Sequence, residues 1–424
     1  MDKQSAHFDH YVLCHHCDLL CRLPELAKQQ KAVCPRCQTR LARNCHQMKR
    51  NILIYASSAL VMLLLACSFL FISIRVIGVV NNIGVLQIPI ILYDDNYWAL
   101  MLIFLLFTLC FPAINLLIQI LLCAKTRLSK RAKRRLLILY NQLTHWCMPE
   151  IFMAGVLVSF VKLTNYGDIG LSKAFLPFCL FIWFYLKSTI DFSQYRIWNE
   201  LASNNFAKLP LKEGKTGISQ NIRLCFQCHA ILPAGQTHCP RCKQSGKLRQ
   251  RLNIQWTMAL LLTSFILYIP ANVYGIMQTL FLGSSSTSTI IDGVVYMWQE
   301  GDYPVAFVIF VASIVIPVLK IIALSWLCYF VLVIKRKNKQ DCLKVSRLYK
   351  IVEFIGRWSM IDIFVVAVVS SLIQHGEVIT VYPDIGALFF TAVVIITMIA
   401  SHKFDPRFIW DQRRYIEKSK YPLH

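Results

Sequence analysis

Long runs of apolar residues, separated by short polar segments, dominate this chain of 424 residues. A helix rises 1.5 Å per residue, so roughly 20 apolar residues cross the ~30 Å hydrocarbon core of a bilayer. Four runs with few charges have this length, and four weaker runs are short or interrupted by an ionisable residue. The pattern predicts eight membrane-spanning helices, at 52–74, 97–124, 148–163, 173–190, 254–282, 305–329, 358–374 and 385–401.

The composition excludes an ordinary soluble enzyme, because 56% of the residues are hydrophobic and only 16% are charged. A net charge of +23 would by itself favour nucleic-acid binding. With the N-terminus inside, however, 40 of the 45 Lys and Arg residues fall on one side of the membrane. The positive-inside rule therefore places both termini in the cytosol, and we expect no nucleic-acid partner. The outer loops are acidic, and the Ser/Thr run at 284–289 is expected to be a loop on that side.

The chain contains an internal repeat. The motifs CHHC and CPRC at 14–17 and 34–37 are echoed by CFQC and CPRC at 225–228 and 239–242, and each set precedes four predicted spans. WCMPEIF at 146–152 matches WSMIDIF 212 residues later, and PAIN at 112–115 matches PVLK at 317–320. We expect an all-α polytopic membrane protein with two tandem four-helix modules, each preceded by a small cytosolic four-cysteine zinc ribbon. Its segments would be 1–50 (ribbon), 51–192 (module), 193–250 (ribbon), 251–403 (module) and 404–424 (tail).

The paired cysteines have metal-ligand spacing. Two cysteines two residues apart place both thiolates on one ion, and two such pairs close a tetrahedral shell that suits Zn²⁺. Rubredoxin-like iron and a dithiol redox pair are the alternatives. The neighbouring His15, His16, His229 and His238 are not expected to bind, since four thiolates already fill each shell. The two structural zinc ions are expected on Cys14, Cys17, Cys34 and Cys37, and on Cys225, Cys228, Cys239 and Cys242.

Ionisable residues inside the predicted spans are candidates for a functional role, because a charge at the bilayer centre costs about 2.5 to 3.5 kcal/mol on the insertion scale. Asp362 and Lys320 lie in the second half, with Ser313 on the face of Lys320. Ser359 and Thr397 lie at a depth similar to that of Asp362. The cluster is either a polar, proton-titratable transport site or a buried ion pair that fixes helix packing.

The first half carries weaker candidates for such a site. Its counterparts to Asp362 and Lys320 are Glu150 and Asn115, so one charge is missing. Lys162 lies near the outer end of its span, where its long side chain can reach the interface. The basic segment at 125–135 is either an interfacial helix on anionic headgroups or a solvated elbow between spans.

Longer motifs resemble the paraquat-inducible protein A family. They are the ribbon before each block of spans, EIFMAGVLVSFVKL at 150–163, LYIPAN at 267–272 and GRWSMID at 356–362. The resemblance covers nearly the whole chain. It implies a protein of the Gram-negative inner membrane that moves lipids to or from a periplasmic MCE-domain partner similar to paraquat-inducible protein B, with an outer-membrane lipoprotein beyond. It also implies a polar network at Ser313, Lys320, Ser359, Asp362 and Thr397. Where a relative has an acidic residue after Lys162, this chain has Asn165.

The function we expect is lipid transport with phospholipid as substrate, coupled to protons through Asp362 and Lys320, and not catalysis. No P-loop motif of the G-x-x-x-x-G-K-[ST] type occurs. Two alternatives remain: a membrane thiol redox protein that uses its Cys-x-x-Cys pairs, and a scaffold that holds the MCE partner without transporting lipid.

Overall fold

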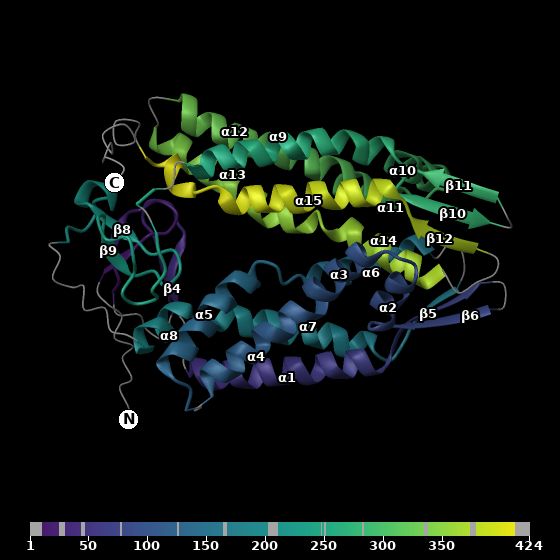
Figure 1. Cartoon of the computed structure of the whole chain (residues 1–424), viewed down its shortest axis with the longest axis horizontal. Coiled ribbons are helices and arrows are strands. Elements are labelled where there is room, and N and C mark those ends of the chain that lie inside the picture. Colours follow the sequence, from purple (N-terminus) through teal and green to yellow (C-terminus); the bar gives the residue numbers. More distant parts are fainter. Residues whose placement is uncertain are drawn as a thin grey trace.

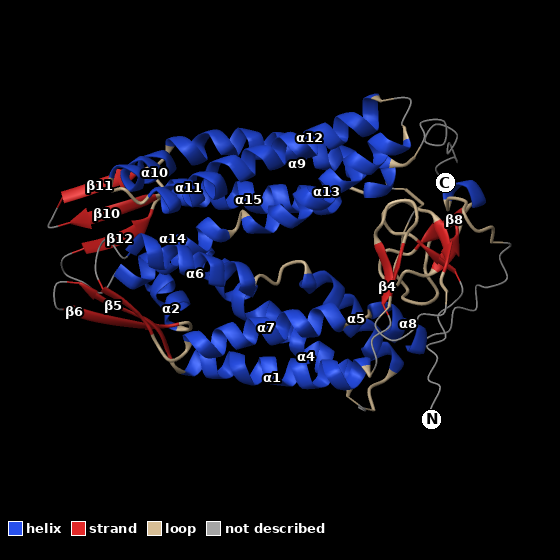
Figure 2. Ribbon diagram, turned by 180° about the vertical axis from the view of Figure 1, so that it is seen from behind, coloured by secondary structure: helices blue, strands red, loops and turns tan. Residues whose placement is uncertain are grey.

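The structure is a computed structural model, and it describes residues 11–24, 30–43, 47–76, 79–124, 127–163, 168–201, 211–246, 248–249, 252–281, 284–334, 338–373 and 379–411. Helices make up most of it, and strands lie at its two ends (Figure 1, Figure 2). The strands near one end belong to the cysteine-rich segments. Those at the other end form two separate small sheets.

Six helical segments among the described residues are long and apolar enough to cross a membrane. A seventh results if α7 (Phe175–Asp191) and α8 (Gln194–Leu201), which meet at a 52° bend, count as one span. The expected span at 358–374 corresponds to α14 (Ile361–Ile373), which has 13 residues, and residue 374 lies outside the described part. The six segments are Met48–Ser68, Trp98–Cys123, Lys130–Phe160, Leu252–Val273, Ala306–Val333 and Ile385–Lys403.

In the first half, α1 (Met48–Ser68) packs against α4 (Phe111–Cys123) and α7. The buried face of α1 carries the small residues Ala56, Ala59 and Ala66, which let neighbouring helices approach closely. The helices α5 (Lys130–Thr144) and α6 (Pro149–Leu163) follow α4, and Ser129 caps α5 by accepting a bond from the Ala132 N–H at 3.2 Å.

In the second half, α9 (Leu252–Val273) packs along α15 (Ile385–Lys403), and α12 (Ile316–Val333) packs against α9 and α13 (Lys339–Trp358). The two halves meet where α6 packs on α14. A Cβ added at Gly155 would lie 3.0 Å from the Phe364 Cβ, so glycine lets these two helices approach more closely than a larger residue would. Phe152 lies between the rings of Phe104 and Phe364, with ring centroids 5.2 and 5.9 Å away.

Two segments widen from the α-helical to the π-helical pattern, η1 (Leu105–Cys110) and η3 (Val311–Val315). A proline, Pro112 or Pro317, is the second residue after each segment, and it has no N–H to donate to the carbonyl four residues earlier. The backbone continues with a five-residue bond instead, from the N–H of Phe111 to the Leu106 carbonyl and from that of Ile316 to the Val311 carbonyl. Helices α3 (Trp98–Phe104) and α11 (Tyr303–Phe310) precede the two segments.

Two three-stranded antiparallel sheets lie at the end opposite the cysteine-rich segments (Figure 1). In the first, β5 (Leu70–Val76) lies between β6 (Val79–Gly84) and β7 (Asp168–Leu171), with Ser73 opposite Asn82 and Gly170. In the second, β10 (Met277–Phe281) lies between β11 (Ser284–Ser288) and β12 (Ile379–Pro383). The short helices α2 (Gln87–Asp94) and α10 (Ile290–Gln299) follow β6 and β11.

These sheets correct three expectations. The prediction of a loop at the Ser/Thr run is wrong, because five of its residues form the edge strand β11. The runs at 52–74 and 254–282 are too long as helices, since α1 ends at Ser68 and α9 at Val273. Hydropathy alone does not separate a strand from the helix that it follows. The chain is therefore mostly helical rather than all-α.

The cysteine-rich segments are built from short hairpins. The first contains β1 (Tyr11–Leu13), β2 (Leu20–Arg22), β3 (Lys31–Val33) and β4 (Arg40–Arg43), and the second contains η2 (Ile218–Gln220), β8 (Ile222–Leu224) and β9 (Ile231–Pro233). They contact each other, since the Leu20 N–H donates to the Lys215 carbonyl at 3.0 Å. We call them the first and the second ribbon.

Candidate functional site

Four tight turns hold the cysteine pairs. The residue after the second cysteine of each pair has a left-handed backbone, with φ of 58° at Asp18, 58° at Gln38, 54° at His229 and 65° at Lys243. Its N–H bonds back to the first cysteine of the pair, as from Asp18 to the Cys14 carbonyl at 2.9 Å and from His229 to the Cys225 carbonyl at 2.9 Å. The chain therefore reverses direction at each pair, and both thiols of the pair point toward the same position.

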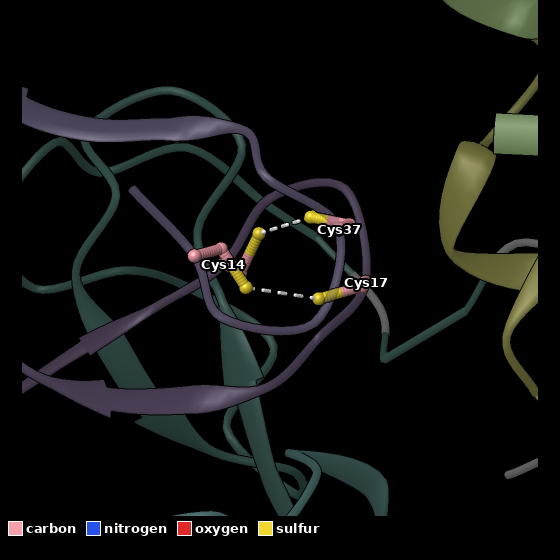
Figure 3. A group of neighbouring side chains, drawn as sticks. Cys14, Cys17 and Cys37 are labelled. Atoms are coloured by element: carbon pink, nitrogen blue, oxygen red, sulfur yellow. Dashed lines mark hydrogen bonds between the residues drawn. The ribbon is translucent and has the colours of Figure 1, made fainter. Parts of the chain in front are cut away.

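Each ribbon brings four buried thiols together, with all four sulfur atoms within 4.8 Å of one another. In the first ribbon the Sγ atoms of Cys14 and Cys37, and of Cys17 and Cys34, are 3.5 Å apart (Figure 3). The pairs Cys225 with Cys242 and Cys228 with Cys239 repeat this spacing. Zn–S bonds of about 2.3 Å in a tetrahedron separate the sulfur atoms by roughly 3.8 Å, so both thiol sets fit Zn²⁺.

Two of the histidines beside these thiols, His15 and His229, bring the two ribbons into contact. The ring of His15 is 5.9 Å from that of His229 and 5.2 Å from that of His16. Burial lowers the pKa of His15 to about 3, so this contact is made by neutral rings. The two four-residue clusters found among the described residues consist of cysteine alone.

Each ribbon is held by the arginine of its CPRC motif. The Arg36 guanidinium lies over the ring of Trp410, 4.6 Å from its centroid. Trp410 directly follows the short helix η4 (Pro406–Ile409). Arg241 donates to the Trp198 carbonyl at 3.2 Å and to the Asn199 side chain, in α8. Trp198 and Trp410 are 212 residues apart, the spacing of the motif match in the sequence.

The ribbons dock crosswise. The cysteines of the first ribbon share an apolar cluster with Leu324, Phe404 and Ile409 of the second half. Those of the second ribbon share one with Leu137 and Trp198 of the first half. The first ribbon, which precedes the first half in the sequence, thus packs against the second half. The second ribbon, which precedes the second half, packs against the first half.

An ionic cluster ties the first ribbon to the start of α9 and to the segment that follows α15, which lie at the same end of this helix pair. Arg249 lies just before α9, and its guanidinium bonds Asp18 at 2.9 Å and Asp411 at 2.8 Å. Burial by itself would lower the pKa of Arg249, but the charges of Asp411 and Asp18 raise it above its usual value. Asp405 and Arg407 form a buried pair beside it, at 2.7 Å.

The expected polar cluster of the second half is only partly one site. Ser313 and Asp362 line a common cavity, together with three polar side chains that were not among the expected site residues, Ser288, Thr289 and Thr391. Lys320, Ser359 and Thr397 are buried but do not line the cavity. The Thr397 hydroxyl donates to the Val394 carbonyl at 2.9 Å.

The ammonium group of Lys320 has a backbone partner, because its Nζ donates to the Gly356 carbonyl at 3.3 Å. A Cβ at Gly356 would lie 2.9 Å from the Lys320 Cε and 3.0 Å from its Nζ. The absence of a side chain at Gly356 therefore gives Lys320 its place against α13.

The cavity occupies about 80 Å³, room for a few water molecules. It lies between the two halves, since Leu100 and Val158 of the first half face Val366 and Phe390 of the second. Ile276 and Met277 close it toward the sheet end. Its walls are mostly apolar, and Asp362 is the one ionisable group among its lining residues.

The first half has a polar cluster at corresponding positions, 205 or 212 residues earlier. Thr108 lies in η1 as Ser313 lies in η3, and both are buried. Asn115, in the place of Lys320, donates to the Cys147 sulfur at 3.1 Å and to the Thr144 hydroxyl at 3.3 Å. Cys147 and Tyr185 correspond to Ser359 and Thr397. The repeat spacing would have identified Thr108, Cys147 and Tyr185, which the sequence analysis did not consider.

Glu150 lies in the first turn of α6, the position that Asp362 has in α14. The backbone of Lys162 belongs to the last turn of α6, and its side chain lies outside the described residues.

Comparison with known proteins gives the chain close relatives. The family model "Paraquat-inducible protein A" matches residues 50–202 and 254–414. The intermembrane transport protein PqiA of Escherichia coli K12 is 46% identical, over 97% of this chain and 98% of its own. A probable intermembrane transport protein of Haemophilus influenzae is 27% identical, over 94% and 95%. The lipophilic envelope-spanning tunnel protein A of E. coli K12 is 28% identical, over 95% and 91%. No solved structure matches the chain.

Proposed function

This chain belongs to the paraquat-inducible protein A family, and from that premise we propose that it is an inner-membrane subunit of an intermembrane lipid transport system. The match to relatives named as intermembrane transport proteins, over nearly the whole of each chain, is the observation that carries the proposal. These relatives are named for transport and not for an enzymatic reaction.

We propose eight spans in two tandem four-helix modules, with the segment boundaries expected above and both termini in the cytosol. The distribution of charge supports this orientation. Among the described side chains, the ribbon end carries most of the Lys and Arg residues. The described side chains of the sheet end include Lys173 and the acidic residues Asp94, Asp95, Asp292, Glu300, Asp302 and Asp384.

We assign one structural zinc ion to each ribbon, bound by its four cysteines. A complete thiolate shell leaves no open coordination position, so the metal would fold the ribbon rather than react. The crosswise docking would then join the cytosolic ends of the two modules.

The partners that we propose come from the family resemblance. A periplasmic MCE-domain protein similar to paraquat-inducible protein B would receive or deliver the lipid at the sheet end, and an outer-membrane lipoprotein would complete the path. The substrate would be a membrane phospholipid.

Transport would use the cavity between the halves. At about 80 Å³ it is far smaller than a phospholipid, so the helices around it must separate to admit one. Asp362 is placed to control this step, since protonation would remove a charge from a mostly apolar cavity wall and lower the cost of filling it with acyl chain. Lys320, held by Gly356, would fix the cytosolic side of the same helices.

The test replaces Asp362 with Asn and Lys320 with Ala, in cells whose outer-membrane integrity depends on this system. We expect loss of envelope function with normal levels of folded protein. Glu300→Gln is the matched control, because Glu300 is an exposed acid at the sheet end that lines no part of the cavity. Full function of both cluster variants would exclude proton coupling through this site. A scaffold without transport predicts that outcome, together with normal partner assembly.

A further inference from the structure

A second pocket lies at the ribbon end of the first half. It is a groove of about 590 Å³ where the start of α1, the end of α4, the first turn of α5 and the end of α8 meet. Lys49 and Arg50 come from α1, Lys133 from α5 and Glu200 from α8. Its apolar walls are Leu53, Leu122, Ile197 and Leu201.

The charge of the groove is positive. Lys49 pairs with Glu200 at 2.5 Å, and both side chains are about half exposed, at 47% and 49%. Within the part of the chain that the structure describes, Arg50 and Lys133 have no ion-pair partner. Two cations therefore remain unbalanced at this groove, beside two helix N-termini that have no acidic residue in the first turn.

In the proposed orientation, the groove lies at the depth of the lipid headgroups. With 21 residues, α1 is about 31 Å long, so it spans the hydrocarbon core and its first turn lies at the membrane surface. Lys49 and Arg50 lie in that turn, and Lys133 lies in the first turn of α5. Leu53 lies one turn deeper along α1, and Leu122 lies in the last turn of α4. A ligand that fits must be anionic at one end and apolar at the other.

The other half does not repeat this groove. The residues that correspond to Lys49 and Lys133, 205 and 212 positions later, are Ile254 and Val345. Both are buried, at 7% exposure, in the apolar cluster beneath the first ribbon. Arg50 corresponds to Gln255, which is exposed and uncharged. At these three positions the first half thus has cations, whereas the second half has two packed apolar side chains and an amide. General enrichment of basic residues on one membrane side does not produce this difference.

We propose that the groove is a binding site for an anionic glycerophospholipid, whose phosphate is held by Arg50 and Lys133 and whose acyl chain lies along Leu53 and Leu122. The site rests on the proposed orientation, which places this end at the cytosolic leaflet. It is separate from the cavity at Asp362.

The test is a titration of the purified, delipidated full-length protein with phosphatidylglycerol or phosphatidylcholine, read by native mass spectrometry. Each Lys or Arg at a membrane surface contributes about 1 kcal/mol, so the double variant Arg50→Gln/Lys133→Gln should weaken phosphatidylglycerol binding about thirtyfold. Its phosphatidylcholine binding should not change. Arg50→Lys/Lys133→Arg retains both charges and should retain most of the affinity.

The matched control is Lys344→Gln/Arg347→Gln, which removes the same charge from exposed positions of α13. It should bind phosphatidylglycerol like the unaltered protein. Equal weakening in the control and the groove variant would overturn the proposal in favour of a diffuse basic surface. Equal binding of both lipids to the unaltered protein would also overturn it.

One further arm of the experiment separates a lipid headgroup from a soluble phosphate as the source of the bound phosphate. Glycerol 3-phosphate lacks acyl chains, and we expect it not to displace the lipid at millimolar concentration. Displacement would make the groove a site for a soluble phosphate and would contradict the proposal. The readout needs no transport, so a failure here leaves the Asp362 test unaffected, and the reverse also holds.

Discussion

Gly356 shows at the scale of a single residue how the chain accommodates an amine among apolar helices. Its missing side chain leaves room for Lys320, and its carbonyl accepts the Lys320 bond. Gly356→Ala should lower the free energy of unfolding by about 1 kcal/mol, because the end of the Lys320 side chain must shift away from the added methyl group and its bond to the Gly356 carbonyl weakens. A thermal shift assay in detergent measures this loss.

Gly293→Ala is the control for that substitution, since a Cβ at Gly293 meets nothing within 4 Å. Gly293 lies within α10, where alanine is the better helix former, so its replacement should be neutral or slightly stabilising. Equal destabilisation by the two substitutions would contradict the close approach of Lys320.

The eight ribbon cysteines carry the second residue-scale prediction. If each cluster holds zinc, these eight thiols should resist alkylation until a chelator removes the metal, and all eight should then react. Thiol counting by mass spectrometry with and without chelator, in denaturant-free detergent, measures the difference. Ready alkylation before chelation, or disulfides that vary with redox poise, would support the redox alternative instead.

At the scale of elements, the crosswise docking makes a paired prediction. Trp410→Ala should open the first ribbon, so that β1 and β2 lose protection from hydrogen exchange while β8 and β9 keep theirs. Trp198→Ala should do the reverse, and each variant serves as the control for the other. Both side chains are buried, so each loss should cost about 3 to 5 kcal/mol. Opening of the same ribbon by both substitutions would refute the crosswise arrangement.

The elements also show what the sequence could and could not predict. Cysteine spacing predicted both thiol clusters, because two Cys-x-x-Cys pairs near each other in the sequence readily supply the four ligands of one metal ion. Hydropathy found the helices but ran through Leu70–Val76 and Met277–Phe281, where strands continue an apolar stretch. The cavity combines residues from distant segments, so Asp362 and Ser313 were found as polar residues in apolar runs while Thr391, with a similar signal, was passed over.

At the scale of the whole molecule, the arrangement predicts an orientation. Glu300 near the sheets and Ser219 in the second ribbon lie at opposite ends of the helices. A cysteine at position 300 should react with an impermeant maleimide in cells with a permeabilised outer membrane. A cysteine at position 219 should react only after the inner membrane is disrupted. Labelling of both positions before disruption would contradict the proposed topology.

In the proposed transport cycle, a phospholipid enters the cavity between the two halves. A photoreactive amino acid at Val366, which lines the cavity, tests this directly in living cells. The matched position is Val368 on the same helix, which is 1% exposed and does not line the cavity. We expect phospholipid cross-linked to the chain at position 366 and little or none at 368. No lipid at 366, or equal lipid at both positions, would contradict it.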